Sequence, residues 1–298
     1  MESTPETIKA VMVGDTEIEY SERGAGEPLL LVHAGVFADW FAPLAASPAL
    51  DGFRIIRVRR AGYGSNAPAS HLTIRDHASH LVALADLLEL ERVHAVGHSS
   101  GALIVLQLAA DRPQLVHSLT LIEPAACGPF QAPAIAEIGE RFVGPAMGAF
   151  AAGDLRGAFD SFMRGVCGDQ HRQVIEQSLG RVGYEQAVRE SSFFFRDEVP
   201  AAMQWQFGPT EAACVRQKPV LIVEGGEGRK LGLLSQQVTE LAVMLLPQAE
   251  VALIDDANHM LPLQDPNALG KAVANFARRH PIRNTGAGHA GARSAVRG

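Results

Sequence analysis

The chain has 298 residues, of which 47 % are hydrophobic and 20 % are charged, and its formal net charge is −7 at pH 7. This composition predicts a globular protein with a large core, and the acidic balance excludes the basic surface that nucleic-acid binding needs. The cysteines Cys127, Cys167 and Cys214 follow no regular spacing. An odd number without a pattern argues against a disulfide framework or a four-cysteine zinc site, so we expect a cytoplasmic protein without a metal.

No targeting or membrane segment is predicted. Residues 1–6 lack a basic region followed by an apolar run, so we expect no signal peptide. The longest stretch without Asp, Glu, Lys or Arg is 93–110, and its polar residues argue against a membrane span. Lysine stands only at positions 9, 218, 230 and 271, and this preference for arginine is typical of a GC-rich bacterial genome.

The first part of the chain alternates between strand and helix patterns. Residues 8–13 and 17–22 predict a hairpin around Gly14 and Asp15. The apolar runs 28–32 and 53–58 predict buried strands. A helix is then expected from Thr73, with Asp76 three residues later as a capping partner.

The remaining elements follow the same rhythm with one interruption. Residues 92–96 predict a strand, 102–110 a helix and 119–122 another strand. Strand patterns are absent over 128–211, where Phe, Met and Gly accompany helix-like segments. Two further strands, 219–223 and 251–254, precede a last helix that Asp265 caps and Pro266 begins.

This order predicts an α/β fold, with a mostly parallel sheet covered by helices on both faces. We expect a core formed by residues 1–127 and 212–282, a helical cap over 128–211 and a disordered tail over 283–298. The cap should lie over the carboxyl ends of the strands, where open α/β sheets bind ligands.

The motif Gly97-His98-Ser99-Ser100-Gly101 lies between the strand of 92–96 and the helix of 102–110. A Gly-x-Ser-x-Gly at such a junction forms a tight turn that exposes the serine hydroxyl. The two glycines are needed because a Cβ there would collide with the neighbouring strand or helix. Ser99 is therefore the candidate nucleophile.

A serine nucleophile needs a base, and His259 follows the last predicted strand at the same sheet edge. We expect the side chain of His98 to point away from the reaction and His33 to have a structural role. His77 and His80 are spaced three apart on a helix, but no carboxylate or cysteine pattern completes a metal site, so solvated helix positions are favoured.

Together these motifs resemble the α/β-hydrolase superfamily over about residues 11–280. The resemblance implies an eight-stranded sheet with a helical cap and a reaction without a cofactor. It also implies an oxyanion hole formed by the backbone N–H of Ser100 and that of Gly35, with Ala34 as the alternative second donor.

The acid of the triad departs from the usual family pattern, because glycine stands where an Asp is expected after the strand of 219–223. Glu227 lies nearby and is one alternative. Glu123 ends the strand next to the elbow, a position that zearalenone-lactone-hydrolase-like members use, and it is the acid that we favour. Asp255 and Asp256 are further alternatives.

The predicted function is hydrolysis of a carboxylic ester or lactone by a Ser-His-Glu triad. Carbon–carbon bond hydrolysis, perhydrolysis, lyase chemistry or a non-catalytic receptor role remain alternatives on the same fold. Arg59 and Arg60 replace a common family motif, and a salt bridge at the sheet edge is favoured over binding of a substrate carboxylate. We expect no membrane partner, and a homodimer is left open. A hydrophobic small-molecule substrate is expected to contact Phe37, Trp40, Met203 and Trp205.

Overall fold

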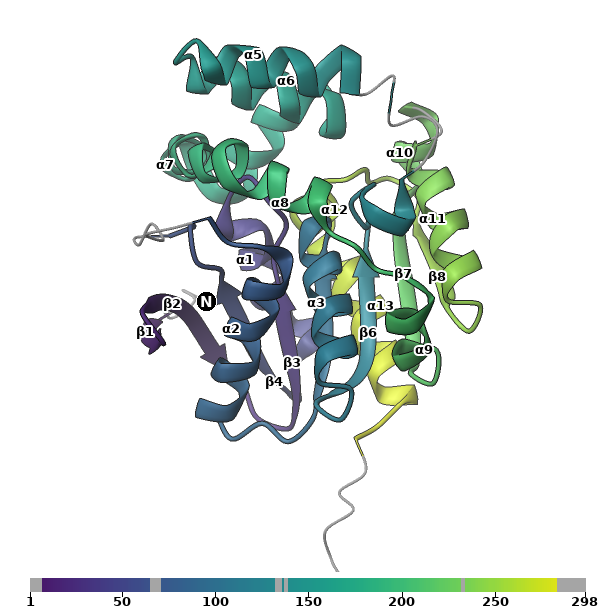
Figure 1. The fold of residues 1–298 in the computed structure, drawn as a ribbon. Helices are drawn as coiled ribbons and strands as arrows, with labels where there is room; N and C mark the ends of the chain where they lie inside the picture. Colours follow the sequence, from purple (N-terminus) through teal and green to yellow (C-terminus); the bar gives the residue numbers. More distant parts are fainter. Residues whose placement is uncertain (1–6, 65–70, 132–135, 137–138, 232–233, 283–298) are drawn as a thin grey trace, which may run out of the picture.

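The computed structural model of the protein describes residues 7–64, 71–131, 136, 139–231 and 234–282. The predicted tail over 283–298 lies outside these residues. One sheet with the strand order β1-β2-β4-β3-β5-β6-β7-β8 forms the centre of the molecule (Figure 1). The strands are β1 (Ile8–Val13), β2 (Thr16–Arg23), β3 (Glu27–Val32), β4 (Phe53–Arg59), β5 (Val93–His98), β6 (Val116–Ile122), β7 (Val220–Gly225) and β8 (Glu250–Ile254).

The sheet is mostly parallel, which confirms the predicted fold class. Strand β2 pairs antiparallel with both β1 and β4, whereas the pairs from β4 through β3, β5, β6, β7 and β8 are all parallel. The carboxyl ends of the parallel strands therefore meet at one edge of the sheet, and the loops after them come close together.

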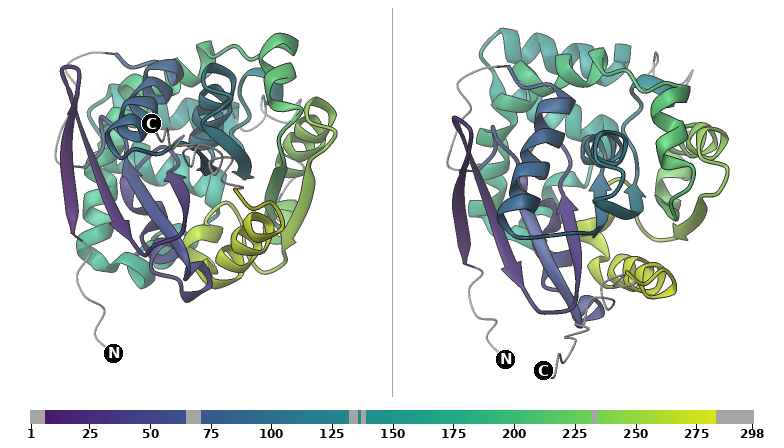
Figure 2. Two further views of the ribbon diagram at one scale, coloured as in Figure 1. Left: turned by 90° about the horizontal axis from the view of Figure 1, so that it is seen from below. Right: turned by 60° about the horizontal axis from the view of Figure 1, so that its bottom comes forward.

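Both faces of the sheet are apolar because successive side chains alternate between them. In β3, Leu30 and Val32 belong to the core on one face, whereas Leu29 and Leu31 belong to the core on the other. The first face is covered by α2 (Ile74–Leu87), α3 (Ser100–Asp111), α9 (Pro209–Val215) and α11 (Leu234–Leu245). The second is covered by α1 (Ala42–Ala45), α12 (Leu261–Gln264) and α13 (Pro266–Arg279) (Figure 2).

Two helix starts form as their sequences predict. The hydroxyl of Thr73 accepts a hydrogen bond from the Asp76 N–H at 3.1 Å, and the Asp76 carboxylate accepts one from the Thr73 N–H at 2.8 Å. Asp265 caps α13 by accepting from the Ala268 N–H at 2.8 Å. Each cap satisfies N–H groups that have no partner inside the helix.

A group of helices between β6 and β7 lies beyond the carboxyl ends of the strands (Figure 1). We call α5–α8 together with η5 the cap helices. They are α5 (Gly144–Ala151), α6 (Leu155–Cys167), α7 (His171–Phe193), the π-helical turn η5 (Phe194–Glu198) and α8 (Val199–Gln204). The short elements are η1 (Ala38–Phe41), η2 (Pro48–Leu50), η3 (Gly128–Phe130), η4 (Gly139–Val143) and α10 (Gly226–Leu231). None of the helices in the described ranges is both long enough and apolar enough to cross a membrane.

Of the five buried histidines in the described residues, burial acts most strongly on His33, His77 and His98, and the expected solvated position is wrong for His77. Burial disfavours the charged imidazolium and lowers the pKa of each well below its ordinary value of 6.5. Arg60 adds to the effect at His33 and His77, and His259 adds to it at His98. All three are therefore neutral in the folded protein at pH 7.

We predict that acid destabilises the protein through these groups. Below the ordinary pKa of 6.5, the unfolded chain binds protons that folded His77 does not, so stability is lost as the pH falls. The His77→Leu variant lacks one such group. Between pH 7.5 and 5.5 its free energy of unfolding should fall by about 1.4 kcal/mol less than that of the wild type, as measured by urea unfolding. Equal losses in both proteins would contradict this account.

Candidate active site

The turn between β5 and α3 holds Ser99 in a strained conformation, with φ 53° and ψ −118°. A methyl group built on Gly101 would lie 2.2 Å from the Val32 carbonyl oxygen of β3. One built on Gly97 would lie 2.4 Å from the Gly101 carbonyl oxygen. Both glycines are thus required by close backbone contacts, and Ser99 is left half-exposed at the carboxyl edge of the sheet.

His259 lies in the turn after β8 at the same edge, next to Glu123 from the end of β6. Its Nδ1 lies 3.4 Å from Oε2 of Glu123. The other carboxylate oxygen accepts a hydrogen bond of 2.7 Å from the Gly225 N–H, which fixes its orientation. Glu123 has a positive φ of 42°, so a second residue of the site occupies strained backbone.

His98 supports the backbone of this histidine, a role that the sequence did not indicate. Its Nε2–H donates to the backbone carbonyl of His259 at 3.0 Å, and the two rings lie 4.8 Å apart. The residue before Ser99 therefore holds the backbone of His259. Asn258 adds a link to the cap helices, because its side-chain amide donates to the Cys167 carbonyl at 2.9 Å.

The alternative acids lie in the segments that follow β7 and β8. Glu227 is in α10, where its backbone N–H donates to the Ala257 carbonyl at 2.8 Å, and Asp255 and Asp256 are exposed. The carboxylate that meets Nδ1 of His259 is that of Glu123. Within the described chain, no hydrogen bond joins the Ser99 hydroxyl to His259. Such bonds are often long in free enzymes and shorten when substrate binds.

The turn after β3 lies beside Ser99 and carries the Gly35 N–H. The Gly35 carbonyl accepts hydrogen bonds from the Phe37 N–H at 3.0 Å and from the Trp40 indole at 2.8 Å. This forms a γ-turn around Val36, whose φ is 77°. Among the described residues, no acceptor binds the N–H of Gly35 or that of Ser100.

Aromatic residues of the cap helices cover this turn. A methyl group built on Gly35 would lie 2.6 Å from the Phe194 ring, and one on Gly62 would lie 2.5 Å from the Phe193 ring. Phe37 and Trp40 stack with their ring centres 4.3 Å apart. The ring of Trp40 also approaches that of His259, at 6.4 Å.

Two residues that we expected to contact substrate lie differently. Met203 is 57 % exposed, so it does not line an apolar pocket in this structure. Its position on a short helix at the protein surface explains the difference. Trp205 is buried, and its indole N–H donates to the Gln107 side chain on α3 at 2.9 Å.

The two arginines at the end of β4, Arg59 within the strand and Arg60 after it, have different partners. Arg59 forms the expected kind of salt bridge, with Nη2 2.6 Å from the Asp39 carboxylate. Arg60 is buried beneath the cap and pairs with Glu198 of η5 at 3.0 Å. Sequence reasoning missed Glu198, because a carboxylate in a helical segment has the same pattern as a solvated surface residue.

The neighbouring thiols are poor competitors for the nucleophile role. Burial, with a smaller contribution from the charge of Glu198, raises the pKa of Cys127 to about 11. Burial and the charge of Glu123 also raise the pKa of Cys167. Within the described ranges, no group of three or more His, Cys, Asp or Glu side chains is arranged to hold a metal ion.

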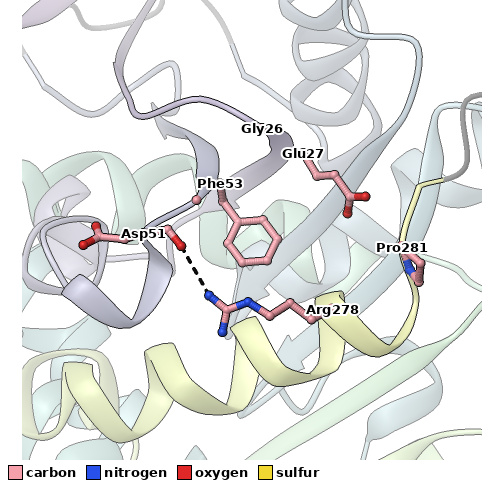
Figure 3. Close-up of a pocket in the computed structure, with 7 residues that line it drawn as sticks. Gly26, Glu27, Asp51, Phe53, Arg278 and Pro281 are labelled. Atoms are coloured by element: carbon pink, nitrogen blue, oxygen red, sulfur yellow. Dashed lines mark hydrogen bonds between the residues drawn. The ribbon is translucent and has the colours of Figure 1, made fainter.

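A shallow pocket of about 350 Å³ lies at the opposite end of the sheet (Figure 3). Glu27 and Phe53, at the starts of β3 and β4, line it, and Arg278 donates to the Asp51 carbonyl there at 3.2 Å. The six residues of β3 separate it from the turn of Gly35 by about 20 Å. It is therefore remote from Ser99.

Comparison of the sequence with known proteins identifies its family and several relatives. A profile of the alpha/beta hydrolase family matches residues 29–272. The dihydrolipoyllysine-residue acetyltransferase component of the acetoin cleaving system of Pseudomonas putida is 28 % identical over 284 residues, which cover 90 % of this chain and 68 % of that protein. The 2-hydroxy-6-oxo-2,4-heptadienoate hydrolase of Pseudomonas putida is 32 % identical over 38 % of this chain and 43 % of its own length. Several other relatives also match over less than half of their length.

Solved structures show the same fold at low sequence identity. The enol-lactonase from Burkholderia xenovorans is 22 % identical with a TM-score of 0.74, and the match covers 91 % of this chain and 100 % of that one. A carboxylesterase from Bacillus subtilis is 22 % identical with a TM-score of 0.68, and the match covers 92 % of each chain.

We predict that Gly101→Ala destabilises the protein. Its methyl group would meet backbone of β3 and not a movable side chain, so a loss of about 1–3 kcal/mol is expected in chemical denaturation. Gly148→Ala is the matched control, because Gly148 lies in α5 with no atom within 4 Å of the added methyl. It should stabilise the protein by about 0.5–1 kcal/mol. Equal effects of the two substitutions would contradict the close contact.

Proposed function

Because the chain belongs to the alpha/beta hydrolase family, we propose that it is a serine hydrolase that cleaves a carboxylic ester or lactone of a hydrophobic small molecule. One observation carries the proposal. Ser99 occupies a strained elbow with φ 53°, and His259, at the same edge of the sheet, has its Nδ1 3.4 Å from the Glu123 carboxylate. A strained, half-buried serine at the same sheet edge as a carboxylate-oriented imidazole has the parts that acyl transfer requires.

In the proposed acylation, the Ser99 oxygen attacks the substrate carbonyl carbon while Nε2 of His259 takes the hydroxyl proton. Glu123 accepts a hydrogen bond from Nδ1–H, which keeps Nε2 free as the base and stabilises the imidazolium that forms. The carbonyl oxygen becomes an oxyanion that the N–H groups of Ser100 and Gly35 stabilise. The carbon–oxygen bond to the alcohol then breaks, and His259 returns its proton to the leaving oxygen.

In the second half of the reaction, water hydrolyses the acyl-enzyme. His259 takes one proton from water as the water oxygen attacks the acyl carbon. The bond to Ser99 breaks, and the proton passes back to the serine oxygen, so that the carboxylic acid leaves and the enzyme is restored. For a lactone, acid and alcohol are released as one molecule.

The aromatic surroundings support an apolar substrate. Phe194 packs against Gly35, and the stacked pair Phe37 and Trp40 lies beside His98 and His259. Carbon–carbon bond hydrolysis is the second candidate, because the 2-hydroxy-6-oxo-2,4-heptadienoate hydrolase of Pseudomonas putida is a relative. A panel of aryl esters, lactones and vinylogous diketones would rank the two candidates by kcat/KM.

Covalent labelling tests the nucleophile. A fluorophosphonate probe should label the wild type at Ser99 and fail to label Ser99→Ala, as read by mass spectrometry of the tryptic peptide. Ser79→Ala, at an exposed position on α2, is the control and should be labelled like the wild type. An unlabelled wild type, or a labelled Ser99→Ala, would show that the protein is not a serine hydrolase of this kind.

Two isosteric substitutions identify the acid. Glu123→Gln should lower kcat on an aryl ester by about 10³-fold or more, because the neutral amide no longer stabilises the imidazolium or its tautomer. Glu227→Gln should stay within about threefold of wild type, and thermal melting would show that both variants are folded. The opposite ranking would assign the acid to Glu227 in α10.

A further inference from the structure

The peptide between Ala34 and Gly35 is held by its oxygen from two sides. The Ala34 carbonyl accepts hydrogen bonds from Nδ1–H of His33 at 2.6 Å and from Nη2 of Arg60 at 2.9 Å. The backbone N–H of Arg60 donates to Nε2 of His33 at 3.0 Å, so the proton of the neutral imidazole is on Nδ1. Arg60 therefore acts on this peptide directly and also through His33.

Fixing the oxygen of this peptide fixes its N–H, because the amide is planar and trans. The N–H of Gly35 points opposite to the Ala34 carbonyl, away from Arg60. A cation on the carbonyl oxygen also polarises the amide and strengthens its N–H as a donor. On the other side, the Gly35 carbonyl is held by Trp40, so the adjoining peptides on both sides of Gly35 are anchored.

The cap holds Arg60 in this position. Glu198 of η5 accepts hydrogen bonds from Nη2 of Arg60 at 3.0 and 3.1 Å, and both side chains are 1 % exposed. The Tyr63 hydroxyl donates to the same carboxylate. Burial, together with the charge of Glu198, raises the pKa of Tyr63 well above its ordinary value, so this hydroxyl stays protonated.

Stability alone does not explain this ion pair. The Nε and Nη1 atoms of Arg60 are buried and have no hydrogen-bond partner within the described residues. Leaving donors of a buried charge unpaired costs free energy that an apolar pair of the same size would avoid. Arg60 lies close to the site, since its Nη2 is 3.5 Å from the Ser100 side-chain oxygen.

We propose that Arg60 is a positioning residue, which sets the direction of the Gly35 N–H and its strength as a hydrogen-bond donor to the oxyanion. Through its pair with Glu198, this effect depends on η5 of the cap helices staying packed over Arg60. The proposal rests on the proposed function, because it assumes that an oxyanion forms at Ser99. It gives the cap a role beyond covering the substrate. Displacing η5 would free Arg60 and weaken the donor before any substrate contact changes.

Kinetics and inhibition of two variants test the proposal. Arg60→Met removes the cation. Glu198→Gln removes the negative charge that pairs with Arg60 and keeps the shape of the side chain. Arg57→Met is the control, since Arg57 is also buried on β4 but pairs with Asp39 at 2.8 Å. We expect Arg60→Met to lower kcat by about 10–10²-fold and to leave KM within about threefold of the wild type. This loss in kcat is smaller than the loss expected when an oxyanion-hole donor is removed altogether. Glu198→Gln should give a smaller loss in the same direction.

An aryl boronic acid, which forms a tetrahedral adduct with a serine, separates positioning from anchoring of the cap. Arg60→Met should weaken its binding by about the same factor as kcat, whereas an ether analogue of the ester should bind as to the wild type. Arg57→Met should lower the melting temperature without changing the ratio of the two inhibition constants. Equal weakening of both inhibitors in Arg60→Met, or the same kcat loss in Arg57→Met, would overturn the proposal.

A measurement without substrate keeps this proposal distinct from the proposed function. In ¹⁵N-labelled protein, the Gly35 amide resonance should shift in Arg60→Met and Glu198→Gln and stay in place in Arg57→Met. An unchanged Gly35 resonance in Arg60→Met would overturn the positioning role even if the wild type hydrolyses esters. A shifted resonance in a protein that fluorophosphonate does not label would support the positioning of this peptide and refute the serine hydrolase.

Discussion

The contact between helix α3 and strand β3 is the constraint on which the site depends. Gly101 brings the first turn of α3 so close to β3 that a methyl group would lie 2.2 Å from the Val32 carbonyl oxygen. With the helix held there, the chain leaving β5 turns within one residue, and Ser99 takes the strain with φ 53°. The same contact sets α3 beside the loop of Gly35, so the proposed nucleophile and the proposed oxyanion turn share one support.

A second layer of support comes from buried carboxylates of the cap helices. Glu190 of α7 accepts from the Ala38 N–H at 2.7 Å and from the Gly64 N–H at 3.3 Å. Burial raises its pKa, because those neutral donors compensate only part of the lost hydration. Glu198 instead pairs with Arg60. The loops after β3 and β4 are therefore held from above by the cap as well as from below by the sheet.

The local features of this arrangement could be predicted from the sequence. The capping residues Thr73 and Asp265 act on groups within three residues, so their patterns predict the observed helix starts. The elbow could be located because a strand, five residues and a helix are contiguous. Glu123 and His259 each follow a predicted parallel strand, and such strands end at the same edge of the sheet. The sequence therefore also predicted that the two would be neighbours, and in the structure His259 Nδ1 lies 3.4 Å from Glu123 Oε2.

The sequence by itself thus determined the α/β fold, the strained serine and the shortlist of partners, because periodicity and turn chemistry act over short distances along the chain. Only the tertiary structure decided that His98 holds the backbone of His259 and that Met203 faces solvent. It alone paired Arg60 with Glu198, 138 residues apart. Contacts across such separations depend on how the cap sits on the sheet, and a charged residue that will be buried has the same local pattern as one that stays in water.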